Sequence, residues 1–157
     1  IDLWIENGYG GASHCFGGIS GDTISVGGDN IINCKNYANI SIKDNGHGFI
    51  TVGGIVARGN VFHCYNAGNI SCNLTGNPNA SIYGITFDTA TNSCNACQYI
   101  SAYGGFIDYL TIKRVAMDTE NCVANQNMLI NGETVKDTVS NGKGLPREQL
   151  EDWYDSQ

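Results

Sequence analysis

Residues 50–71 read ITVGGIVARGNVFHCYNAGNIS, and parts of this pattern return every 30 residues along the chain. The clearest column is isoleucine, with members at Ile40, Ile70, Ile100 and Ile130. Other apolar columns keep the same spacing: Val52, Ile82 and Ile112; Ile55, Ile85 and Val115; Ile50, Ala80 and Leu110. Several columns at one period indicate a structural repeat.

Each unit consists of short runs rich in Ile, Val, Thr and Tyr, punctuated by Gly and Asn, which is typical of strands and turns. No unit contains a helical stripe of about ten residues, and this excludes repeats made of helix pairs. A propeller blade needs about 40 residues. The period therefore predicts an all-β fold, a β-solenoid (β-helix) of about four 30-residue coils that stack at ~4.8 Å.

We expect a single domain over residues 1–157, with repeat coils at 16–131. Residues 1–15 and 132–157 are expected to cap the two ends, because uncovered terminal strands invite aggregation. Within the second cap, LPREQLEDWYDSQ predicts a short helix over the last coil, begun by Pro146.

The first coil is longer than the others. FGGIS begins at Phe16, and its glycine pair precedes that of GGIV by 36 residues instead of 30. We therefore predict a six-residue insertion around residues 21–28.

Composition narrows the function. The chain has 15 acidic and 8 basic side chains and a formal net charge of −7. No basic patch is visible, which argues against a nucleic-acid partner, and no apolar run approaches the roughly 18 residues of a membrane span. The start at Ile1, without a leader pattern, predicts a processed form or a piece of a longer protein.

Seven cysteines form a second repeating feature. Cys34, Cys64 and Cys94 keep the period and Cys122 follows 28 residues later, so we predict one structural column of buried thiols. Stacked coils also bring thiols within disulfide range, and an oxidising location would favour a bridge. For the C-x2-C pair, Cys94 and Cys97, a disulfide across a turn is favoured over a zinc site, which needs a second ligand pair.

One charged column also keeps the period: Arg58, Asp88 and Asp118. The simplest expectation is a surface pair between Arg58 and Asp88, with Asp118 solvated. Stacked carboxylates could instead share a calcium ion, or serve as the acid pair of a polysaccharide-acting enzyme. We expect no other metal site.

Asparagine recurs as well. Asn36 aligns with Asn66, and Asn39 with Asn69. Buried asparagine ladders stabilise stacked strands, so a ladder or turn role is favoured. The N-x-S/T triplets at Asn39, Asn69, Asn73 and Asn79 are also candidate glycosylation sites.

Exposed aromatic rings would favour carbohydrate binding. The candidates are Tyr65, Tyr83, Tyr99 and Tyr103, which fall into different columns. The comparison across coils thus predicts no aromatic stripe.

The string GGIVARGNVFHCYNAGNIS, residues 53–71, resembles the GLUG-type repeat of bacterial surface proteins. INCKNYANIS matches the latter half of that repeat, and residues 82–101 match it more loosely. Residues 112–122 depart from it, with Lys113 and Arg114 where glycines are expected. The resemblance covers roughly residues 16–131. It implies a secreted or surface-attached β-solenoid, often part of adhesin-like or protease-like proteins, and supplies no catalytic motif.

These observations predict a cell-surface or secreted structural and adhesive module that is not an enzyme and needs no cofactor. Its expected partners are other protein subunits, including copies of itself in an oligomer or fibre, or surface glycans and proteins. One alternative is a module that recognises carbohydrate or a host protein. The other is an enzyme that uses Asp88 and Asp118.

Overall fold

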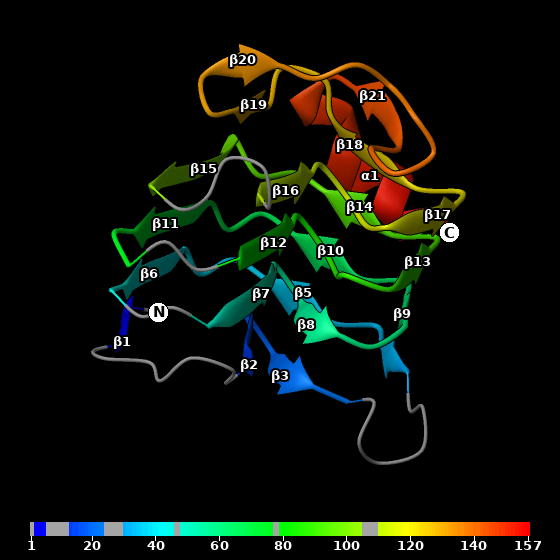
Figure 1. Ribbon diagram of the computed structural model, residues 1–157. Helices are drawn as coiled ribbons and strands as arrows, with labels where there is room; N and C mark the ends of the chain where they lie inside the picture. The colour runs from blue at the N-terminus through cyan, green and yellow to red at the C-terminus, as the bar shows by residue number, and fades with distance from the viewer. Residues whose placement is uncertain (1, 6–12, 24–29, 46–47, 77–78, 105–109) are drawn as a thin grey trace.

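The computed structural model describes residues 2–5, 13–23, 30–45, 48–76, 79–104 and 110–157. Over these residues the chain is mostly strand and winds into a β-solenoid of about three turns, followed by one short helix (Figure 1). The predicted fold class is confirmed. The isoleucine column spans four levels because the chain extends past its last full turn.

The strands stack into five sheets. The six-stranded sheet contains β1 (Asp2–Ile5), β6 (Ile40–Asp44), β11 (Ile70–Leu74), β15 (Tyr99–Gly104), β19 (Leu129–Ile130) and β20 (Glu133–Thr134). The five-stranded sheet contains β21 (Lys143–Leu145), β18 (Val123–Asn125), β14 (Cys94–Asn95), β10 (Tyr65–Asn66) and β5 (Lys35–Asn36). The β7 sheet contains β16 (Leu110–Lys113), β12 (Asn79–Tyr83), β7 (Phe49–Gly53) and β2 (Ser13–Gly17). The β9 sheet contains β17 (Asp118–Glu120), β13 (Thr89–Thr91), β9 (Val61–Phe62) and β4 (Ile31–Ile32). The remaining pair is β3 (Ser20–Asp22) with β8 (Val56–Arg58).

Strand register follows the sequence columns. Ile40 lies opposite Ile70, Ile70 opposite Ile100, and Ile100 opposite Ile130. Among the described strands every pairing is parallel except that of β19 with β20. The 30-residue period is therefore the length of one coil.

The insertion in the first coil is confirmed. Asp22 lies opposite Arg58, a step of 36 residues, whereas Ile31 lies opposite Val61, a step of 30. The six additional residues therefore fall between Asp22 and Ile31. Most of them, residues 24–29, lie outside the described residues.

A glycine pair bends each coil between two parts of the core. Ile50 and Val52 pack in the cluster between the six-stranded sheet and the β7 sheet, whereas Ile55 packs in a second cluster near the β9 sheet. At the bend, a Cβ on Gly53 would lie only 1.9 Å from the Val56 carbonyl oxygen. The tight turn therefore requires glycine there.

A buried asparagine ladder runs through the coils, as predicted. Nδ2 of Asn36 donates to Oδ1 of Asn66 at 2.9 Å, and Nδ2 of Asn66 donates to Oδ1 of Asn95 at 3.0 Å. The same amides also donate to the carbonyl oxygens of Gly54 and Gly84. Each level is thereby bonded to the next inside the core.

The glycine column next to this ladder ends at Arg114. A Cβ on Gly54 or on Gly84 would lie 2.0 Å from the carbonyl oxygen of the following level. Above Arg114 the space is open to a side chain, because residues 132–145 form a cap there instead of another coil. The Arg114 side chain is 1% exposed and donates to Asp137, at 2.7 Å, and to two cap carbonyls. Its hydrogen bond also lowers the pKa of Asp137.

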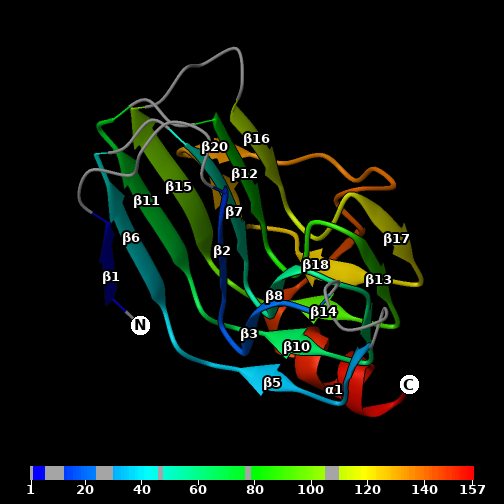
Figure 2. The same ribbon diagram turned by 60° about the horizontal axis from the view of Figure 1, so that its bottom comes forward.

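The C-terminal helix lies on the flank of the solenoid. The 3-10 helix η3 (Arg147–Gln149) follows Pro146 and continues into α1 (Leu150–Asp155). Leu150 and Tyr154 pack in one buried cluster with Tyr65, Cys94 and Val123. Figures 1 and 2 both place α1 beside β14.

The predicted helix is thus present, but its position differs from the expectation that it covers the last coil. The reason is that residues 132–145 already cap that coil, while the five-stranded sheet offers apolar side chains from several levels. Tyr154 stacks on His63 with ring centroids 4.3 Å apart, and the Lys35 Nζ lies 4.7 Å above the same ring. Residues 1–15, expected as the other cap, supply β1 and the start of β2.

Within the described part of the chain, no helix has the length and apolar character needed to cross a membrane.

Candidate functional site

The cysteine column is real for three of its four predicted members. Tyr65 lies opposite both Lys35 and Cys94, so the position of Cys64 corresponds to Cys34 on one side and to Ser93 on the other. Cys94 in turn lies opposite Val123, which places Cys122 beside Ser93. Serine therefore occupies the third level, and the prediction that Cys94 belongs to this column is wrong.

The physical cause is a compensated slip in the third coil. Phe87 bonds to Ala57 at a step of 30 residues, but Ala90 lies opposite Val61 at a step of 29. The lost residue is recovered before Ile100, which again lies 30 after its partner Ile70. The hydroxyl of Ser93 accepts a hydrogen bond from the Cys64 N–H at 3.0 Å.

The predicted disulfide between Cys94 and Cys97 is also corrected, because both are free thiols. The Cys94 side chain packs in the cluster beneath α1, and that of Cys97 packs in the main core against Met128 at 3.2 Å. Burial raises the pKa of Cys64 and Cys122 to about 11 and that of Cys97 to about 12. Since the thiolate is the reactive form, these thiols are chemically quiet at neutral pH.

The charged column is divided by the same slip. Arg58 lies opposite Asp22, and Asp88 accepts a hydrogen bond from the Gly59 N–H at 2.7 Å. Asp118 is exposed and lies opposite Thr89, not opposite Asp88. No ion pair between Arg58 and Asp88 occurs among the described residues, and no cluster there combines three metal-ligating side chains.

The four candidate glycosylation asparagines have different surroundings. Oδ1 of Asn39 accepts from the Asn69 N–H, and Oδ1 of Asn69 accepts from the Gln98 N–H, so these two belong to a turn ladder. Asn73 is exposed on β11 and Asn79 is half-buried on β12.

The outer face of the six-stranded sheet carries exposed aromatic side chains. On β15, Tyr99 and Tyr103 are 42% and 66% exposed, whereas Ile100 and Ala102 point into the core. By contrast, Tyr65 and Tyr83 are buried. This pair was missed because the tyrosines were compared across coils. Alternation along YISAY, which puts every second residue on one face of a strand, would have found it.

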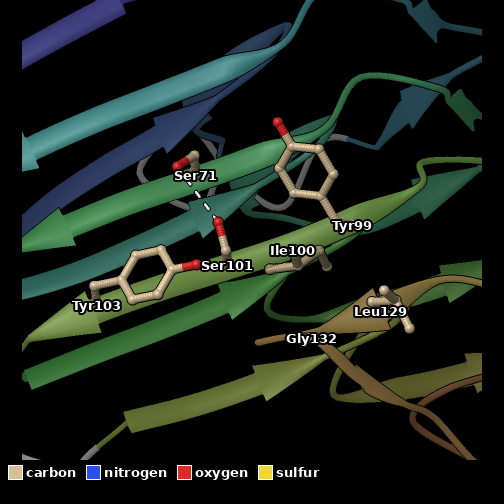
Figure 3. Close-up of a pocket in the computed structure, with 7 residues that line it drawn as sticks. All are labelled: Ser71, Tyr99, Ile100, Ser101, Tyr103, Leu129 and Gly132. Carbon is tan, nitrogen blue, oxygen red and sulfur yellow. Dashed lines mark hydrogen bonds between the residues drawn. The ribbon is translucent and has the colours of Figure 1, made fainter.

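Two serines lie between these rings. Figure 3 shows Tyr99 and Tyr103 projecting on either side of Ser71 and Ser101, whose hydroxyls are hydrogen-bonded at 3.4 Å. The rings and hydroxyls line a shallow hollow of about 430 Å³. Its complete lining is Ser71, Tyr99, Ile100, Ser101, Tyr103, Leu129 and Gly132.

This arrangement suits a ligand that presents both flat apolar patches and hydroxyls. Aromatic rings supply a stacking surface, and Tyr and Ser hydroxyls both donate and accept hydrogen bonds. Since β15 is fixed by parallel neighbours on both sides, the side chains stand on a rigid scaffold.

Comparison with protein-family models, curated proteins and solved structures finds no match. The GLUG-type resemblance therefore stays a prediction from the residues alone.

Proposed function

We propose that this chain is a secreted or surface-attached adhesive module that binds an extended glycan, without catalysis, on the outer face of its six-stranded sheet. The observation that carries the proposal is the pair of exposed rings, Tyr99 and Tyr103, on either side of the Ser71–Ser101 hydroxyl pair. The exported location rests on the sequence resemblance.

The spacing favours a chain over a single sugar. Tyr99 and Tyr103 are four residues apart on one strand, so their Cα atoms are separated by ~13 Å. One sugar ring cannot stack on both side chains. An oligosaccharide can stack on both and bond to the serine hydroxyls between them.

A structural subunit that stacks coil on coil is the weaker proposal. At the C-terminal end, the Arg114 side chain and residues 132–145 occupy the place where a further coil would sit. Assembly through that end would require the cap to move.

Glycan-array binding of the wild type and the Tyr99→Ala/Tyr103→Ala variant tests the proposal. We expect selective binding of oligosaccharides by the wild type and loss of at least about tenfold in affinity in the double variant, from two stacking contacts. Tyr37→Ala is the matched control, because Tyr37 is 60% exposed on another sheet. Glycan binding that survives the double variant would refute this site.

A further inference from the structure

A second hollow continues the first around the edge of the six-stranded sheet. The two share Tyr99 and Leu129, and the second has a volume of about 410 Å³. Its lining is Gln98, Tyr99, Asn125, Asn127, Leu129 and Arg147. A ligand that leaves the first hollow past Tyr99 thus meets amides and a guanidinium.

The polar groups of this second hollow are not used equally by the fold. Asn125 is committed, since its Nδ2 donates to the Cys97 carbonyl and its Oδ1 accepts from the Asn127 N–H. The side chains of Gln98, Asn127 and Arg147 are exposed and make no hydrogen bond or ion pair within the described residues. Three groups therefore remain available to a ligand.

Charge distinguishes these hollows from the rest of the molecule. The chain has a formal net charge of −7, yet neither lining contains a carboxylate. Beyond Arg147 the surface becomes acidic, because a third hollow there is lined by Glu148 and Glu151. An anionic group would consequently be held at Arg147 and not farther along.

We infer that the glycan is acidic: its chain runs from Tyr103 across Tyr99 into the second hollow, where the Arg147 guanidinium binds a sugar carboxylate. A guanidinium binds a carboxylate through two parallel N–H···O bonds, a geometry that lysine lacks. Gln98 and Asn127 can bond to the hydroxyls of the same sugar. The inference rests on the proposed function and adds the class of glycan.

The test uses hexamers of galacturonic acid and of hyaluronan, each paired with its neutral methyl ester, measured by calorimetry at low salt. We expect each acid to bind the wild type at least about tenfold more tightly than its ester, as charge-assisted hydrogen bonds predict. Arg147→Met should abolish this preference while retaining ester binding, and Arg147→Lys should restore only part of it. Lys136→Met, which removes an exposed charge outside both linings, is the control.

The outcomes separate the two proposals. Equal binding of acid and ester, with no effect of Arg147→Met, overturns the acidic preference but leaves glycan binding in place. Failure of every hexamer to bind overturns both. Binding of poly-glutamate as tightly as the acidic hexamers, with the same dependence on Arg147, also overturns the inference, since the site would then recognise acidic peptides.

Discussion

The two outward faces of this solenoid are built alike but finished differently. The five-stranded sheet and the six-stranded sheet both stack parallel strands at one 30-residue period, and both carry tyrosines. On the five-stranded sheet, Tyr65 is 7% exposed because α1 lies against it, whereas Tyr99 and Tyr103 on the other sheet are uncovered. The chain thus conceals one aromatic face with its own C-terminus and leaves the other available to a partner.

The largest expected effect tests whether both faces depend on the same interior. In Gly84→Ala the new Cβ would lie 2.0 Å from the Arg114 carbonyl oxygen and 2.0 Å from Asn95 Nδ2. Because the nearest atom is backbone, we expect a loss of more than about 4 kcal/mol in unfolding free energy, measured by urea denaturation. Gly132→Ala, with no atom within 4 Å of its Cβ but with φ at 84°, should cost only about 1 kcal/mol. Similar losses in the two variants would mean that the stack tolerates a side chain inside.

Removal of the cover should be nearly as costly. Leu150 is fully buried in the cluster between α1 and the five-stranded sheet, so Leu150→Ala should lower the unfolding free energy by about 3 kcal/mol. Leu129→Ala on the open face, where the side chain is 36% exposed, should lower it by less than about 1 kcal/mol. Equal values from urea denaturation would contradict the distinction between the faces.

Alkaline pH should weaken the interior shared by both faces. Burial raises the pKa of Cys72 from 9.0 to about 12. The unfolded chain releases this proton near pH 9 while the folded chain retains it, so the stabilisation is complete below pH 9 and is lost as the pH rises toward 12. Each such thiol contributes at most about 1.4 kcal/mol per pH unit.

Urea denaturation at about pH 8 and about pH 10 measures this effect. The unfolding free energy of Cys72→Ala should fall less between the two pH values than that of the wild type. A parallel fall in both proteins would show that Cys72 does not contribute.

The smallest stability effect is expected on the open face. Tyr99→Ala and Tyr103→Ala should each change the unfolding free energy by less than about 0.5 kcal/mol, because both rings are largely in water. Thermal denaturation followed by circular dichroism measures the change. A large loss would mean that these rings support the fold and are not reserved for a ligand.

The sequence was sufficient for the coil and insufficient for its exceptions. The isoleucine column fixed the register because buried strand residues must lie above one another. Cys94 was misassigned because a residue lost near Asp88 and regained before Ile100 leaves the overall period unchanged. The two tyrosines of the open face were overlooked because the columns were compared between coils and not along one strand.

The position of α1 could not be predicted in the same way. Its docking depends on a surface formed by His63, Tyr65 and Val123, which come from different levels of the stack. Periodicity shows that the helix has an apolar side, but it does not show which of two available surfaces that side covers. Arg114 was noticed only as a departure from the glycine pattern, and its buried bonds to the cap explain that departure.

Arg114 also limits how such a protein can lengthen in evolution. A duplication of one 30-residue unit before this residue would insert a level whose glycine and asparagine match those above and below it. The binding face would become longer without any change in its existing contacts. The same duplication placed after Arg114 would enclose a charged side chain between two backbones. The ancestral gene could therefore grow from its interior but not from its capped end.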